Sequence, residues 1–216
     1  MKKTTTILCL GIALCMLGCS DDDDQVTTTS TVPFSLTASL SPRSSDAEDT
    51  GILQGNWDAN SQLAVIKTGS SGVPKSILTR KTDSSDTFTG NLSTLVKNEN
   101  EIAVFYPAAA ITANSSDTLT QTLNLSGQDG TLAGITNYDY LWAQCKAGMN
   151  ETTGSSACEM TSLVTIGKFQ YTVNGGSPLN NITRITITAT AGTLYSSAVM
   201  KLKNGEFSST QTGNIT

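Results

Sequence analysis

Few side chains in this sequence could carry out covalent or metal chemistry. It contains five cysteines, 18 acidic and 13 basic residues, and no histidine. Without histidine there is no Ser-His-Asp or Cys-His nucleophile system and no histidine-ligated zinc, iron or copper. A net charge of -5, with the basic residues dispersed, argues against nucleic acid as the main partner. We therefore expect a protein that is not an enzyme and that uses no metal and no cofactor.

Cys145 and Cys158 are the cysteines that lie outside the first nineteen residues. In an exported protein they could form a disulfide, because the Gly- and Ser-rich segment Gly148–Ala157 between them can fold back. Such a bond contributes about 3 kcal/mol by the chain-entropy estimate. The alternative is a pair of buried free thiols that pack as small apolar side chains. With no second cysteine pair nearby, we do not expect a zinc site.

Carboxylates and aromatic rings offer two further kinds of chemistry. The acids form no Asp-x-Asp-x-Asp-Gly loop, so we interpret them as solvated charges rather than as a calcium site. A glycosidase pair is defined by geometry, and nothing in the pattern brings two acids to a shared face. The aromatic residues could stack on sugar rings or fill a β-sheet core. The residues concerned are Asp46, Glu48, Asp49, Asp83 and Asp86, and Trp57, Tyr138, Tyr140 and Trp142.

The N-terminus predicts export and a lipid anchor. Met1-Lys2-Lys3 is a short basic region, and the apolar run Ile7–Leu17 is too short to span a hydrocarbon layer of about 30 Å. Residues 1–18 are therefore expected to be a signal peptide. Met16-Leu17-Gly18-Cys19 resembles a bacterial lipobox, with methionine where leucine is usual, and implies acylation of Cys19 as the mature N-terminus. The alternative is an ordinary cleaved signal with an incidental cysteine.

A tether is expected at residues 19–33. Ser20-Asp21-Asp22-Asp23-Asp24 places four carboxylates side by side, which repel each other and cannot be buried together. The Thr-rich segment that follows continues this solvated, extended stretch. The acidic run resembles the export tag of surface lipoproteins in some Gram-negative anaerobes. The alternative is a spacer that carries no address.

The remaining chain predicts β structure in an extracellular setting. Only 14% of residues are charged, against about 25% in typical domains. Apolar and polar residues alternate without a fault along Phe34–Leu40, which is the period of a half-buried strand. Ile102–Tyr106 is apolar on both faces, as in a central strand covered on each side. Short strands joined by turns predict an antiparallel sandwich or barrel. Further strands are expected at Leu63–Lys67, Ser76–Arg80, Thr87–Gly90, Thr118–Leu125, Tyr138–Cys145, Phe169–Val173, Ile182–Thr190 and Ala198–Lys203.

Two segments have alternative interpretations. Glu159–Ile166 could be helical, because Met160, Leu163 and Val164 would share one face of a helix. After Phe207 a Ser/Thr-rich string runs through residues 208–216 without a closing signal. We interpret it as a flexible end or as the start of a missing second domain, and we place the β domain at residues 34–207.

The order of these features resembles a known family. A lipobox and an acidic tether lead to a first strand that ends near Pro42-Arg43. Phe88-Thr89-Gly90-Asn91-Leu92, Ala103-Val104-Phe105-Tyr106-Pro107-Ala108 and Tyr138-Asp139-Tyr140-Leu141-Trp142-Ala143 then follow in order. Over most of residues 19–216 the chain resembles the fimbrillins, the lipoprotein pilins and pilus-like adhesins of Gram-negative anaerobes.

This resemblance implies a fold and an assembly mechanism. The fold is an all-β, antiparallel Greek-key sandwich of the transthyretin-like type, forming the N-terminal domain of a two-domain protein. A lipoprotein of the outer membrane would enter a type V pilus after a protease cuts behind an arginine beyond the first strand, and Arg43 matches that position. A strand of the neighbouring subunit would fill the vacated groove. Asp117-Thr118-Leu119 resembles the O-glycosylation tripeptide of these bacteria and implies modification of Thr118.

The burial expected for the first strand supports this mechanism independently. Phe34, Leu36 and Leu40, if they face inward, contribute about 5–9 kcal/mol as an upper estimate, and Ala38 adds little. Since a whole domain is stable by about 5–15 kcal/mol, losing this strand would leave a domain in need of a replacement. Its neighbours would expose backbone groups that template strand addition. The alternative is a permanent edge strand, with Arg43 as an ordinary exposed loop residue.

We therefore predict a surface-exposed lipoprotein of the outer membrane that becomes part of a fimbria, as a pilus subunit or a pilus-associated adhesin. Its expected partners are the lipid anchor and other pilin subunits, with a host protein or glycan as an open further partner. Two alternatives remain. One is a monomeric glycan-binding outer-membrane lipoprotein, and the other is a pilus anchor subunit that is never cut.

Overall fold

The computed structural model of the 216-residue chain describes residues 30–43, 51–69, 73–83, 86–111, 120–128, 131, 134–165, 167 and 195–212. The expected signal peptide, the acidic run, Cys19 and Thr118 lie outside these residues, as do the expected strands Phe169–Val173 and Ile182–Thr190. Regular structure in the described residues consists of β-strands and three short 3-10 turns. The strands are β1 (Thr31–Leu40), β2 (Gln62–Lys67), β3 (Ser76–Arg80), β4 (Thr87–Ser93), β5 (Glu101–Tyr106), β6 (Thr120–Asn124), β7 (Leu141–Lys146), β8 (Gly148–Met149), β9 (Gly154–Ser162), β10 (Tyr195–Lys201) and β11 (Phe207–Thr212). The turns are η1 (Gly51–Gln54), η2 (Ala108–Ala110) and η3 (Ile135–Asn137).

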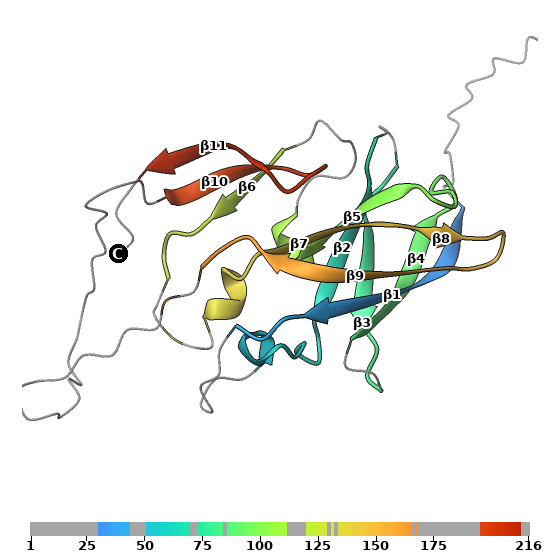
Figure 1. Ribbon diagram of the computed structural model, residues 1–216, viewed down its shortest axis with the longest axis horizontal. Coiled ribbons are helices and arrows are strands. Elements are labelled where there is room, and N and C mark those ends of the chain that lie inside the picture. Colours follow the sequence, from blue (N-terminus) through green and yellow to red (C-terminus); the bar gives the residue numbers. More distant parts are fainter. Residues whose placement is uncertain are drawn as a thin grey trace, which may run out of the picture.

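Most of the strands belong to one sheet that closes on itself (Figure 1). The strand order is β1-β4-β3-β2-β5-β7-β9, β9 pairs back to β1, and β8 pairs with β9. Strands β2, β3 and β4 are consecutive neighbours and β1 lies beside β4, which is the strand order of a Greek key. Neighbours in this sheet are antiparallel except β1 and β9, which are parallel.

The all-β fold expected from the sequence is confirmed, but the first sheet is a closed, mixed ring rather than one half of a purely antiparallel sandwich. Closure gives β4 and β9 a partner on the side where each would otherwise be a free edge. The alternation in Phe34–Leu40 predicts a strand, yet it carries no information on the direction of its neighbours. Because β1 has a neighbour on both sides, it is not the edge strand that the alternative interpretation required.

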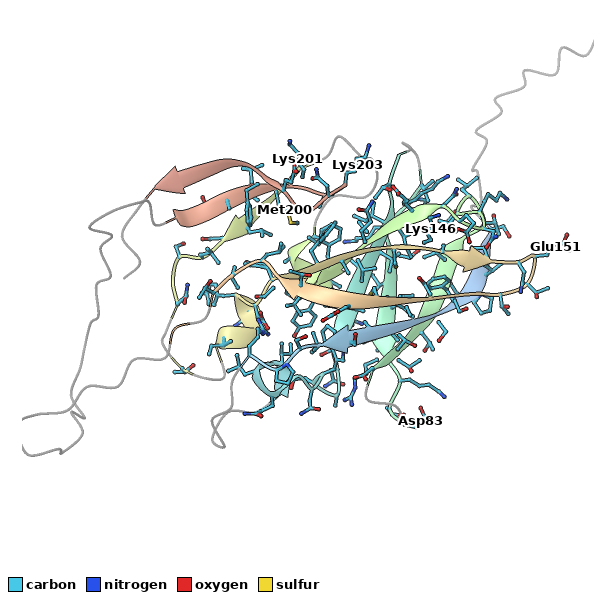
Figure 2. The ribbon with its side chains drawn as sticks, in the orientation of Figure 1. Asp83, Lys146, Glu151, Met200, Lys201 and Lys203 are labelled. Carbon is cyan, nitrogen blue, oxygen red and sulfur yellow. The ribbon has the colours of Figure 1, made fainter. Side chains whose placement is uncertain are left out.

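Two apolar cores lie on opposite faces of the strands that separate them. In β5, the side chains of Ile102 and Val104 belong to the core inside the ring, whereas Ala103 and Phe105 belong to a second core outside it. This confirms the prediction of a central strand covered on both faces. Met200 projects from β10 into the second core (Figure 2) and is fully buried.

A smaller sheet of three strands, in the order β11-β10-β6, covers the outer face of the ring at this second core (Figure 1). Leu123 of β6 and Met200 of β10 pack there against Ile66 and Phe105. Strand β11 occupies residues 207–212, so a strand is present where the sequence indicated a flexible end or the start of another domain.

The helical interpretation of Glu159–Ile166 is wrong, because β9 runs through Ser162. The helix was expected from the shared face of Met160, Leu163 and Val164. In the structure Met160 faces the ring interior, while Leu163 and Val164 pack against the second core. Pairing with β1 and β7 therefore outweighs the weak helical periodicity of this segment.

Candidate functional site: the slot of β1 and the Arg43 ion pair

Strand β1 fills the space between β4 and β9 with side chains that point into the ring. Phe34 is 2% exposed, and Leu36 and Ala38 are fully buried. Leu40 is half-buried and packs against the same core. The inward face expected from the alternation is therefore confirmed, while the role of β1 as an exchangeable strand stays a prediction. We call the space between β4 and β9 that β1 occupies the slot.

Both residues that pair with Phe34 across the slot are glycines. In the register of the sheet Phe34 faces Gly90 of β4 on one side and Gly154 of β9 on the other. A Cβ atom on Gly154 would lie 2.7 Å from Cδ2 of Phe34, closer than side-chain atoms pack. The absence of a side chain at Gly154 thus makes room for the aromatic ring of Phe34, whereas a side chain on Gly90 would first meet Ile77 and Leu78 of β3.

At Ala38 two hydrogen bonds hold the backbone of β1 in the slot. The indole of Trp57 donates a hydrogen bond from Nε1 to the Ala38 carbonyl oxygen at 2.6 Å, and the Ala38 N–H donates to the carbonyl oxygen of Asp86 at 2.9 Å. Trp57 is 3% exposed and packs edge-on against Phe88 at 5.0 Å and Tyr106 at 5.3 Å between ring centroids. A larger side chain at position 38 would have to displace this packing.

Arg43, three residues beyond β1, is bound rather than free. Its guanidinium makes a bidentate ion pair with Asp139 and donates a further hydrogen bond to Ser162 Oγ at 3.1 Å. The Arg43 side chain is 19% exposed and that of Asp139 is 1% exposed. The Arg43 N–H also donates to the Leu53 carbonyl oxygen at 2.8 Å. The interpretation of Arg43 as an ordinary exposed loop residue is therefore wrong.

Asp139 was not among the site residues predicted from the sequence, although it lies in the segment Tyr138–Ala143 that carries the family resemblance. A signal was present, since an acid between two tyrosines at the start of an apolar strand is buried only if it is paired. What could not be seen is that its partner lies 96 positions earlier in the chain. The pair joins the end of β1 to the start of β7.

Cys145 in β7 and Cys158 in β9 both pack against the core inside the ring and are half-buried thiols in the structure. A hydrogen bond from the Cys158 thiol, stronger in effect than the opposing burial, lowers the pKa of Cys145 to about 7. The same interaction, together with burial, raises the pKa of Cys158. The structure thus brings together the two cysteines that the sequence singled out.

The aromatic residues considered for stacking on sugars have structural roles in most cases. Trp57 and Tyr140 are buried, and the Tyr140 hydroxyl donates to the Asn124 carbonyl oxygen at 3.0 Å. Burial raises the pKa of Tyr140. Tyr138 is half-buried and donates to the Gly127 carbonyl oxygen at 2.8 Å, and Trp142 packs against the second core. These four residues therefore do not form an exposed stacking surface.

Several candidate residues are not brought into this site. Asp46, Glu48 and Asp49 lie outside the described residues, whereas Asp83 forms an ion pair with Lys81 at 3.0 Å in an exposed loop. Within the described part of the chain, no three acids or cysteines cluster in a way that could hold a metal ion. The same part of the chain contains no helix with the length and apolar character needed to cross a membrane.

Comparisons with known proteins give similarities of structure and none of sequence. No family model matches the chain, and no curated protein matches it. A protein with a suggested role in cell adhesion from Bacteroides ovatus ATCC 8483 is similar in structure, with a TM-score of 0.49 and 13% identity over 86% of this chain and 72% of that one. A fimbrial assembly protein from Parabacteroides distasonis ATCC 8503 has a TM-score of 0.43 and 11% identity over 85% of this chain and 72% of that one.

Proposed function

We propose that this protein is a non-enzymatic surface lipoprotein that enters a fimbria, as a pilus subunit or a pilus-associated adhesin, by exchange of its first strand. Acylation of Cys19 anchors the precursor to the outer membrane. Proteolysis after Arg43 then separates β1 from the rest of the chain, and a strand of a neighbouring subunit takes its place. The sequence resemblance to the fimbrillins supports each of these steps, and a host protein or glycan could then be bound by the assembled polymer.

The observation that carries the proposal is the position of β1 between two strands, directly before Arg43. Its ladders with β4 and β9 each contain seven residue pairs. Its buried side chains contribute about 5–9 kcal/mol as an upper estimate, a large part of the roughly 5–15 kcal/mol that stabilises a domain. Removing β1 would thus uncover an apolar slot and two rows of backbone groups, which together form a template for an added strand.

The Arg43 ion pair adds a requirement to this exchange. A cut after Arg43 leaves the arginine on the departing segment, so Asp139 loses its cation while its side chain is only 1% exposed. An unpaired buried carboxylate is costly. We infer that a replacement strand that brings a basic residue to Asp139 is held more tightly than one that does not.

The experiment is to treat the protein with an arginine-specific protease and to follow assembly by SDS-resistant ladders on gels. Cleavage after Arg43 should produce ladders, and Arg43→Lys should prevent both cleavage and ladders while keeping a cation beside Asp139. Arg80→Lys, at the end of β3, is the matched control and should leave ladder formation unchanged. Monomers that remain after complete cleavage at Arg43 would refute assembly by strand exchange.

A second candidate function is a pilus anchor subunit that keeps β1 and its lipid. The Arg43–Asp139 ion pair favours it, because a trypsin-like protease must take the guanidinium into its own binding pocket. In this case Cys19 and Phe34 would be found in the same polypeptide extracted from the cell surface. The monomeric glycan-binding alternative has no comparable support, and oligosaccharide binding by isothermal titration would be the evidence for it.

A further inference from the structure

Strands β7 and β8 pair with β9 only at the two ends of the boundary between them, which we call the seam. Strand β7 pairs with β9 through Leu141–Ser162 and Trp142–Thr161. At the far end, β8 pairs with β9 through Gly148–Ser155 and Met149–Gly154. Between these ladders lie residues 143–147 on one side and 156–160 on the other. The tip of this hairpin, marked by Glu151 in Figure 2, projects at the end of the molecule.

Both ladders share one register, and that register places Cys145 opposite Cys158. In every pair of the two ladders the residue numbers sum to 303, and 145 plus 158 gives the same sum. Backbone hydrogen bonds from Leu163 to Tyr140 and from Asn150 to Thr153 mark the even-numbered positions of the first strand as hydrogen-bonded pairs. The cysteines therefore occupy a non-hydrogen-bonded position, where Cα atoms in antiparallel strands are about 4.5 Å apart.

Both cysteine side chains face the same core inside the ring. Ser156 Oγ, two residues before Cys158, lies 3.2 Å from Cys145 Sγ. Ser156 Oγ also donates to the Lys146 carbonyl oxygen at 2.7 Å, so side chains hold the seam where the ladder is interrupted. At such a position a laddered antiparallel pair has a Cα separation of about 4.5 Å, which is within the roughly 4.4–6.8 Å that a disulfide spans, so closing the seam here brings the two cysteines into bonding range.

We propose that Cys145 and Cys158 form a disulfide site that closes the β7–β9 seam in an oxidising environment. The oxidant is an external disulfide, such as glutathione disulfide or a disulfide oxidoreductase. The Cys145 thiolate attacks it, forms a mixed disulfide and releases one external thiolate. Cys158 gives up its proton and attacks the Cys145 sulfur, which releases the second external thiolate. Two protein thiols are oxidised and one external disulfide is reduced to two thiols.

The bond matters most when β1 is absent, a consequence that rests on the proposed strand exchange. Every ladder pair made by residues 156–160 of β9 is with β1, from Leu36–Ser156 to Leu40–Met160. Without β1 this part of β9 has no laddered neighbour, and β9 is one wall of the slot. A disulfide to β7 keeps that wall in place until another strand enters.

The test is disulfide mapping on the full chain after equilibration with glutathione disulfide. Trypsin cuts after Lys97, Lys146 and Lys168, so the two cysteines fall on separate peptides, residues 98–146 and 147–168. We expect these peptides to be recovered as one linked species, 2 Da lighter than their sum, and to separate on reduction. Cys145→Ser and Cys158→Ser should each abolish the linked species. Two free, alkylated thiols, or a glutathione adduct that persists on either cysteine, would overturn the proposal.

A second measurement separates this site from the proposed function. Hydrogen exchange at residues 156–160 should be at least tenfold slower in the oxidised than in the reduced protein after cleavage at Arg43, and Cys145→Ser should lose this difference. A linked species without this protection would contradict the role of the bond in the slot wall. The linked species itself requires no cleavage and no assembly, so its formation is independent of whether strands are exchanged.

Discussion

The Arg43–Asp139 ion pair should control how fast a protease cuts behind β1. Asp139→Asn keeps the size of the side chain but removes its charge. Breaking a fully buried pair costs about 3–5 kcal/mol. Because Arg43 is 19% exposed and asparagine still accepts one hydrogen bond, we expect about 2–3 kcal/mol here.

The free energy lost in Asp139→Asn predicts a faster tryptic cleavage after Arg43. Cleavage after Arg43 requires the local opening that frees the guanidinium, and it follows the population of the opened form. At about 1.4 kcal/mol for each factor of ten, Asp139→Asn should increase the rate of tryptic cleavage after Arg43 by about 30- to 150-fold. The rate is measured by quantifying the peptide ends in samples quenched over time.

Cleavage after Lys81 provides an internal control. Lys81 lies in the β3–β4 loop, with a side chain that is 52% exposed and forms its ion pair with Asp83 rather than with Asp139, so its cleavage should change by less than about twofold. An unchanged rate after Arg43 would show that the ion pair does not guard this bond. A parallel rise at both sites would mean that the substitution loosens the whole domain, which would also refute the reasoning.

Three further predictions concern the slot and the thiols. Phe34→Ala should lower the free energy of unfolding in urea by about 3–5 kcal/mol, because flanking glycines cannot fill the cavity. Thr37→Val, on the outward face of β1, should change it by less than about 0.5 kcal/mol, and equal effects of the two would argue against a buried slot. Trp57→Phe should cost about 2–3 kcal/mol by circular dichroism, through the lost hydrogen bond to Ala38 and the smaller ring, and a loss below about 0.5 kcal/mol would contradict this anchoring role. The rate of alkylation of Cys145 should rise as the pH increases through about 7, because only the thiolate reacts. In Cys158→Ala the midpoint pH of this rise should move up towards the ordinary thiol pKa of 9. An unchanged midpoint would contradict Cys158 as the cause of the lowered pKa of Cys145.

The parts of the fold that sequence alone predicted are those in which large side chains repeat with period two. Strand β3 was expected at Ser76–Arg80 and occurs there. The burial of both faces of β5 could be predicted because Ile102–Tyr106 is apolar throughout. Strand β9 was not expected. Its inward residues include Gly154 and Ser156, which are small because β1 supplies Phe34 and Leu36 at the same levels of the ring.

In the candidate site too, features set by neighbouring residues could be predicted from the sequence, whereas contacts between distant segments could not. The inward face of β1 follows from its own residues, and so does the position of Arg43 after it. Neither the parallel contact with β9 nor the partner of Asp139 can be predicted from the local sequence, because each partner lies about a hundred positions away. Similarly, Cys145 and Cys158 were singled out by type and spacing, but their register became visible only in the hairpin.

The mixed pairing of β1 bears on the direction in which another strand could enter the slot. Since β1 is antiparallel to β4 and parallel to β9, these two walls run in opposite directions. An inserted strand in either direction is therefore parallel to one of these two strands and antiparallel to the other. Backbone hydrogen bonding thus favours neither direction strongly. The fit of the side chains must decide instead, because the slot holds the ring of Phe34 beside Gly154 at one level and only the methyl group of Ala38 at another. A copy of β1 inserted in reverse over residues 34–40 would place Leu36 at the level of Ala38 and Phe34 at the level of Leu40.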